Sequence, residues 1–183
     1  MSTFDTTSDQ PAASPTDPAP QVSLGHCFYF PSLGVSDSLL HPPPEATGEA
    51  TLTPEALVLH FRAWPDDLRF ELDRARLPGP AAWVAPYALR SPAQPLAPAR
   101  GCYQYTREPA IEAVRGLLRL SELAAQLTGS VTITVYDARQ QLLSGYYEVR
   151  AANQPDPTRA APASATCTIL LAGDFDNVKL RME

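Results

Sequence analysis

The chain has 183 residues, of which 44% are hydrophobic and 19% charged, and its formal net charge is −6. This length suits a single domain with a tail. Residues 1–61 hold seven carboxylates and no Lys or Arg, which argues against nucleic acid as a partner, since no surface would neutralise phosphates. No hydrophobic run approaches the roughly 20 residues that an integral membrane helix needs.

The first 21 residues differ from the rest in composition. They are mostly Ser, Thr, Asp, Pro, Ala and Gln, and Phe4 is their one large hydrophobic side chain after Met1. Such a segment buries too little surface to offset its ordering entropy. We therefore predict a disordered, acidic and proline-rich tail at 1–21 and a single β-rich domain at 22–183.

The tail also bears on localisation. It has neither the basic and hydrophobic regions of a signal peptide nor a lipid-attachment cysteine. The protein is therefore expected in the cell envelope or secreted if an export signal was removed, and in the cytoplasm otherwise.

Proline is unusually frequent, since 20 of the 183 residues are proline, about twice the average share. Proline breaks helix interiors, and these prolines separate short hydrophobic runs. We therefore expect a mainly β protein: an antiparallel β-sandwich or barrel with one accessory helix.

Alternating hydrophobic residues predict the strands of the first half. The aromatic run 27–30 predicts a first strand, and the prolines at 42–44 predict a stiff connector. Residues 56–64 alternate, as do residues 68–73. A helix beginning near Asp66 is the alternative for the latter, but Phe70 lies off its hydrophobic stripe.

The middle of the chain combines a broken strand with one helix candidate. Residues 81–89 are hydrophobic but contain Pro86, which suits an edge strand, and residues 102–105 suit another short strand. Residues 109–127 have a proline that fits a first helical position and a glutamate in the first turn. Helix is the favoured structure for this segment, and strand stays open.

The segment 130–150 is the clearest element. Val131 and Ile133 alternate with threonines, and the polar residues 137–141 can turn before a second alternating run, which predicts a β-hairpin. The elements predicted after it are a mobile loop at 152–165 and two strands at 166–171 and 175–182, with a turn at Gly173-Asp174 between them.

Motifs that carry chemistry are absent. The sequence has no G-x-x-x-x-G-K, G-x-G-x-x-G, G-x-S-x-G or H-E-x-x-H pattern, and its three histidines lack metal-ligand spacing. Asp174 and Asp176 offer oxygens of the kind that calcium takes, but an acidic surface turn explains them as well. We therefore predict no catalytic residue, no cofactor and no metal, and a protein that is not an enzyme.

The cysteines number three and are widely spaced. At most one internal disulfide can form, and reduced cysteines in strands are the favoured interpretation. Which two of Cys27, Cys102 and Cys167 would pair is open.

Aromatic residues provide the one hint of a binding surface. Tyr and Trp are the residues that protein or sugar recognition uses, although they can instead cover the second sheet of a sandwich. The possible ligand or partner surface comprises Trp64, Trp83, Tyr87, Tyr146 and Tyr147.

Three stretches share a recognisable pattern: Gly-Ser-Val-Thr-Ile-Thr-Val-Tyr-Asp at 129–137, Leu-Ser-Gly-Tyr-Tyr-Glu-Val-Arg-Ala at 143–151, and Thr-Ile-Leu-Leu-Ala-Gly-Asp-Phe-Asp-Asn-Val-Lys-Leu at 168–180. Together they resemble the C-terminal half of small bacterial envelope lipoproteins of unknown function, and Cys27 is similar to a cysteine near the start of those domains. The resemblance implies an antiparallel β-sandwich or barrel without catalytic residues. The sequence differs from that family in lacking a lipobox and in the helix candidate at 109–127.

A shorter likeness concerns the last strand. The sequence Phe-Asp-Asn-Val-Lys-Leu at 175–180 is similar to the last strand of jelly-roll carbohydrate-binding modules. We expect a non-catalytic binding or interaction domain of the bacterial cell envelope, with a protein partner or a surface glycan. The alternatives are a carbohydrate-binding β-sandwich module and a structural subunit that assembles through β-strand edges. The oligomeric state is open.

Overall fold

The computed structural model describes residues 18–106, 117–124, 126–158 and 166–183. Strands dominate these residues, whose helical elements are two three-residue 3-10 turns, η1 (Arg74–Arg76) and η2 (Pro80–Ala82). The strands are β1 (Gln21–Val22), β2 (Leu24–Phe30), β3 (Val35–His41), β4 (Thr47–Leu52), β5 (Ala56–Ala63), β6 (Asp66–Asp73), β7 (Ala85–Ala88), β8 (Ala99–Thr106), β9 (Leu117–Leu120), β10 (Leu127–Asp137), β11 (Leu142–Pro155) and β12 (Thr166–Met182). The prediction of a mainly β protein is confirmed.

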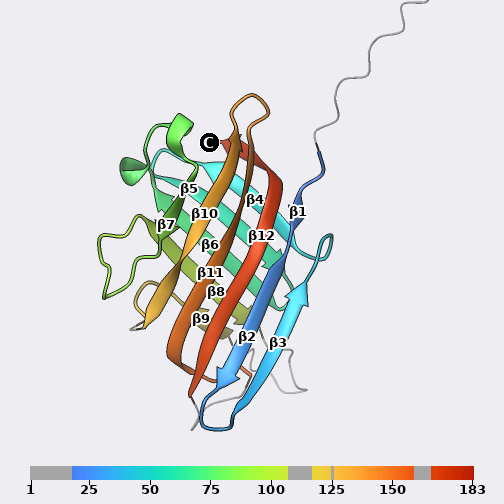
Figure 1. Cartoon of the computed structure of the whole chain (residues 1–183), viewed down its shortest axis with the longest axis vertical. Coiled ribbons are helices and arrows are strands. Elements are labelled where there is room, and N and C mark those ends of the chain that lie inside the picture. Colours follow the sequence, from blue (N-terminus) through green and yellow to red (C-terminus); the bar gives the residue numbers. More distant parts are fainter. Residues whose placement is uncertain (1–17, 107–116, 125, 159–165) are drawn as a thin grey trace, which may run out of the picture.

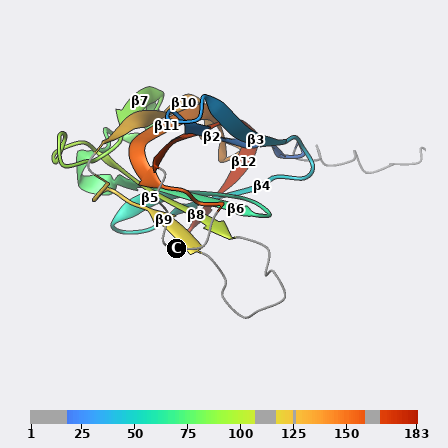
Figure 2. The ribbon, with the colours of Figure 1, turned by 90° about the horizontal axis from the view of Figure 1, so that it is seen from below.

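The strands form two sheets that face each other and share β12 (Figures 1 and 2). The first sheet has the order β7, β10, β11, β12, β2 and β3, and the second has the order β4, β5, β6, β8 and β9. Residues 168–172 of β12 pair antiparallel with β2, whereas residues 180–182 pair parallel with β4. One long strand therefore belongs to both sheets, and the result is a nearly closed, barrel-like structure.

Aromatic side chains fill the centre between the sheets. The ring of Phe61 lies 5.2 Å from the rings of both Tyr147 and Phe175, measured between centroids. Two glycines make room for them, because a Cβ on Gly173 would lie 2.7 Å from the ring of Tyr147, and one on Gly145 would lie 2.6 Å from the ring of Phe175. Each large side chain buried in this way contributes roughly 1.5–3 kcal/mol to stability.

The predicted alternation is confirmed in several strands. In β5, Leu57, Leu59 and Phe61 are buried, and β6 is a strand and not the alternative helix. The hairpin is formed by β10 and β11, with a register shift near Ile133 that leaves Val135 52% exposed. The strand β7, which contains Pro86, has β10 as its one strand partner among the described residues and lies at a sheet edge as predicted.

The helix prediction for residues 109–127 is wrong where the structure describes them. Leu117–Leu120 form β9, which pairs with β8, and turn residues lead from it to β10. Residues 109–116 lie outside the described residues. The four residues Leu-Leu-Arg-Leu are too few to carry a periodicity that separates strand from helix, so pairing with the edge of β8 decides their structure.

Further corrections concern connecting segments. Pro42 does not begin an extended connector, because its carbonyl accepts the N–H groups of Glu45 and Ala46 in a tight turn. The strand β11 continues to Pro155, so the first part of the predicted loop at 152–165 is paired, and residues 159–165 lie outside the described residues. No turn interrupts β12 at Gly173, because the strand stays paired with β11 there.

The predicted tail lies almost entirely outside the described residues, which begin at Pro18. Its last residue, Gln21, belongs to β1 and pairs with Asp176 of β12. Within the described ranges, no helix is long and apolar enough to cross a bilayer.

Candidate functional site

Charged residues cover the outer face of the second sheet. Their ion pairs face solvent, which screens them, so that each contributes little to stability. The ion pairs are Glu49 with Arg62 at 3.1 Å, Arg69 with Glu71 at 2.9 Å and Arg100 with Glu122 at 3.3 Å, and Nε2 of His60 lies within hydrogen-bond distance of Asp67, at 2.8 Å. This face has the character of an ordinary solvated surface.

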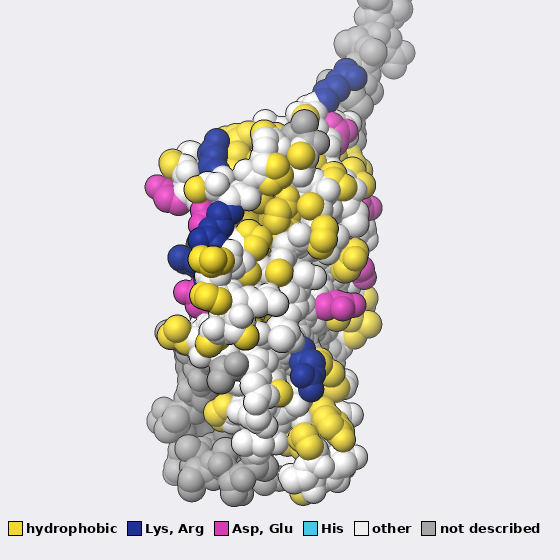
Figure 3. All heavy atoms as spheres, turned by 60° about the vertical axis from the view of Figure 1, so that its left-hand side comes forward, with side chains coloured by type: hydrophobic (Ala, Val, Ile, Leu, Met, Phe, Trp, Pro, Cys, Tyr) yellow, Lys and Arg dark blue, Asp and Glu magenta, His cyan; other side chains and the backbone are white. Residues whose placement is uncertain are grey.

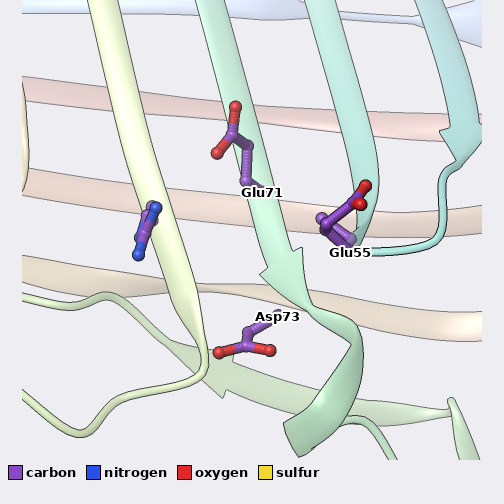
Figure 4. Close-up of a pocket in the computed structure, with 5 residues that line it drawn as sticks. Glu55, Glu71 and Asp73 are labelled. Carbon is purple, nitrogen blue, oxygen red and sulfur yellow. The ribbon is translucent and has the colours of Figure 1, made fainter.

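Three carboxylates surround a pocket at one end of this sheet (Figure 4). Glu55 comes from the turn before β5, whereas Glu71 and Asp73 belong to β6. Two of them have partners, because Glu71 pairs with Arg69 and Asp73 accepts the N–H of Ala75 at 3.1 Å. Among the described residues, no group of three or more His, Cys, Asp or Glu side chains has the arrangement of a metal site.

Figure 3 shows the side of the molecule that lies on the left in Figure 1, where β7 and the loops around it are found. Hydrophobic side chains form a band over its upper half, and Lys, Arg, Asp and Glu border that band. The segment 77–98, which includes β7, is rich in proline and alanine, and its exposed large hydrophobic residues are Val84 and Leu96. Because proline and alanine dominate this segment, it offers few large hydrophobic side chains, and we do not treat this face as the candidate site.

The outer face of the first sheet is different where β2, β3 and β12 lie side by side. A shallow hollow of about 360 Å³ covers two cross-strand rows of residues there. The rows are Leu40, Gly25 and Ala172, followed by Ser38, Cys27 and Leu170. No Lys, Arg, Asp or Glu among the described residues lines this hollow, which we call the β3 hollow.

A second hollow of about 340 Å³ continues this surface across the sheet. Leu170 and Ala172 of β12 line both hollows. The second extends to β11 and β10, where Glu148 and Arg150 add charges to its walls. The hydrophobic surface thus runs from the edge of the sheet at β3 toward a charged border at β11.

The edge beside the β3 hollow is formed by β3 itself. In the described part of the chain, β3 pairs with β2 alone, through seven consecutive residue pairs. Six of its seven residues are exposed, among them Val35 at 52% and Leu40 at 64%. Alternate backbone N–H and C=O groups of an edge strand have no ladder partner, so β3 is a template for a further strand.

The strands β2 and β3 form a hairpin, and near its open end a buried polar cluster joins both strands to the second sheet. Asp66, whose side chain is fully buried at the start of β6, accepts hydrogen bonds from three side chains. Nδ1 of His26 in β2 lies 2.9 Å from both carboxylate oxygens, and Nε2 of His41 in β3 lies 3.2 Å from one of them. The hydroxyl of Tyr103 in β8 donates to the other. The cluster therefore connects β2 and β3 with β6 and β8.

The surroundings of this cluster identify it as an anchor. Phe28 stacks on His26 with ring centroids 4.3 Å apart, and Tyr105 meets the same ring edge-on at 5.5 Å. Burial, followed by the charge of Asp66, raises the pKa of Tyr103, so its phenol stays protonated and donates to the carboxylate. Hydrophobic packing thus leaves the carboxylate and phenol facing each other and not solvent.

The predicted aromatic surface is not assembled in the fold. Trp83, Tyr87 and Tyr147 are 3%, 3% and 1% exposed, so their prediction as surface residues is wrong. Each hydroxyl or indole N–H among them donates to a backbone carbonyl, which explains how polar aromatics fit in the core. Trp64 and Tyr146 are exposed, but the first lies in the turn after β5 and the second on the outer face of β11.

The cysteines are all free and all lie in strands. Cys167 is buried, whereas Cys27 and Cys102 are partly exposed. Burial, followed by the charge of Asp156, raises the pKa of the Cys167 thiol to about 11. Cys27 belongs to the β3 hollow, where its side chain is part of the hydrophobic lining.

Sequence reasoning missed both β3 as a strand and Asp66 as a buried residue. Val35–His41 mixes serine, aspartate and leucine without clean alternation, because neither of its faces is well covered. A signal for Asp66 existed, since it occupies the same alternation phase as Leu68, Phe70 and Leu72 of β6. His26 likewise shares the buried phase of β2.

The fold and the site together define a barrel-like β domain with an open strand edge beside a hydrophobic hollow. No protein-family model matches the chain, and neither a curated protein nor a solved structure is significantly similar to it. The resemblance to small envelope lipoproteins gains no support from these comparisons and stays a prediction.

Proposed function

We propose that this protein is a non-catalytic interaction domain that binds a protein partner at the β3 hollow and the neighbouring edge. The observation that carries the proposal is the difference between the outer faces of the two sheets. The second sheet presents ion pairs, whereas the first presents a hollow without charged lining whose walls include Leu40, 64% exposed, and Leu170, 38% exposed. Clustered exposed hydrophobic side chains of this kind are typical of interaction sites.

The sequence likeness to envelope lipoproteins supports the cell envelope as the place where this binding occurs. The carbohydrate-binding alternative has lost its main support, because three of its five aromatic residues lie in the core. Assembly of copies through strand edges is the competing outcome, and sedimentation of the protein across a range of concentrations detects it.

A peptide library selection tests the proposal. Random 12-residue peptides displayed on phage are selected on the wild-type protein and then compared on two variants. Leu170→Glu introduces a charge into the β3 hollow, and Val58→Glu introduces the same charge on the outer face of the second sheet as a matched control. Circular dichroism and thermal unfolding establish that each variant is folded.

Peptides that bind the wild type and Val58→Glu with similar affinity, and Leu170→Glu at least about tenfold more weakly, are the expected result. Selection that enriches no peptide, or only peptides that bind all three proteins equally, contradicts the proposed function.

A further inference from the structure

We infer that the partner contributes an extended, basic segment that adds to β3 as a further strand of the first sheet. This inference rests on the proposed function and deepens it, because it names the part of the surface that is used and the chemistry of the occupant.

The sheet edges differ in how they are protected. Natural edge strands avoid unwanted pairing by being short or by carrying charged side chains, especially Lys, Pro or a bulge. The edges at β7 and β9 have four residues each, and β7 contains Pro86. The edge at β3 has seven residues, no Lys or Pro, one acidic residue (Asp37), and an uninterrupted register with β2 from Val35 to His41. Of these three edges in the described part of the chain, β3 therefore offers the longest continuous template for strand addition.

The β3 edge is held in place by neighbouring residues. A template strand must be ordered before its partner arrives, since otherwise the ordering entropy weakens binding. The β2 strand fixes β3 along its whole length, and His41 at its end is held by the buried carboxylate of Asp66. The backbone groups that a partner strand would bind are thus already in place.

A strand added to β3 would lie beside the side chains of β3 and the β3 hollow. Side chains alternate across a strand, so every second residue of the partner would extend the outer face next to Leu40 and Ser38. These positions adjoin the β3 hollow, which continues to Leu170 and Ala172. Hydrophobic side chains at alternate positions of the partner therefore fit this face.

The edge at β3 carries negative charge. Asp37 is exposed in the middle of β3, and the side chain of Glu45 just beyond it is 63% exposed. Among the described residues neither carboxylate forms an ion pair with Lys or Arg, and Glu45 lies 3.8 Å from Nδ1 of His41. A basic partner is complementary to this edge, whereas a second copy would bring the same acidic edge and a net charge of −6.

The test uses synthetic fluorescein-labelled heptapeptides that alternate lysine with valine, and fluorescence polarisation with the full chain. A matching peptide alternates glutamate with valine. Two further lysine peptides are N-methylated, one at the odd and one at the even backbone amides. We expect the lysine peptide to bind at least about tenfold more tightly than the glutamate peptide.

N-methylation separates strand addition from binding through side chains. Only every second N–H of an added strand faces the protein, so one methylated peptide should lose binding by about tenfold or more and the other should retain it. If both methylated peptides bind as well as the parent, or if the lysine peptide does not bind, the inference is overturned. The library selection decides the proposed function separately.

A charge exchange gives a second, independent readout. Asp37→Lys should weaken the lysine peptide and strengthen the glutamate peptide, each several-fold. Glu148→Lys makes the same change on β11, two strands further into the sheet from β2, and serves as the control. Equal effects of the two substitutions would locate the peptide away from β3 and overturn the inference. Thermal unfolding verifies that both variants are folded.

Discussion

Replacement of Asp66 by alanine should be among the most destabilising single changes in this chain. The carboxylate is fully buried and accepts hydrogen bonds from His26, His41 and Tyr103. Its removal leaves buried donors unsatisfied, at about 1–3 kcal/mol each. Breaking a buried charged network by removing one partner typically costs about 3–5 kcal/mol. We therefore expect the free energy of unfolding to fall by about 3–5 kcal/mol.

Asp67→Ala is the matched control, because it makes the same chemical change one residue further along β6. The side chain of Asp67 is 41% exposed and pairs with His60 at the surface, so its loss should cost less than about 1 kcal/mol. Urea unfolding followed by the fluorescence of buried Trp83 measures both values. A loss below about 1 kcal/mol for Asp66→Ala, or equal losses for the two variants, would refute the interpretation of the cluster as an anchor.

Three further predictions follow from other features. Gly145→Ala should abolish stable folding or lower the free energy of unfolding by several kcal/mol, measured by thermal unfolding, because its Cβ would lie 2.0 Å from the carbonyl oxygen of Thr132. Gly79→Ala should be nearly neutral, because nothing lies within 4 Å of its Cβ position. Iodoacetamide at pH 8 should modify Cys27 and Cys102 but not Cys167, whose thiol is buried with a pKa of about 11, and mass spectrometry of the native protein would contradict this if all three reacted alike. Burial raises the pKa of both Tyr103 and Tyr147 above the ordinary value of 10.0. The stability that their protonated phenols contribute is therefore kept below about pH 10 and lost as the pH rises above it. A spectrophotometric titration in which every tyrosine ionises near about pH 10 without unfolding would contradict this prediction.

The strands that sequence alone predicted correctly are those with one buried face. The alternation of Leu57, Leu59 and Phe61 indicates the buried face of β5, and that of Val131 and Ile133 indicates the buried face of β10. The strand β3 could not be predicted in the same way, because an edge strand exposed on both faces puts no demand on its residue pattern.

The candidate site was harder to predict because it depends on contacts between distant strands. Trp83 and Tyr87 have the composition of a binding surface, but hydrogen bonds to Pro78 and Trp83 carbonyls let both rings enter the core. The hollow beside Leu40 arises from pairing between residues 25–27 and 170–172, some 145 positions apart in sequence. Periodicity within one segment carries no information about such neighbours.

The double pairing of β12 also has a consequence for biosynthesis. Near the C-terminal end of the sequence, β12 pairs with β1 and β2 near the start of the described residues and also with β4. Many native contacts therefore join residues that are far apart in the sequence. Topologies of this kind form slowly, and the earlier strands cannot complete the first sheet until Thr166–Met182 has been synthesised and is free to pair. During that interval the first sheet lacks its central strand, and a chaperone that shields β2 and β11 would be most useful then.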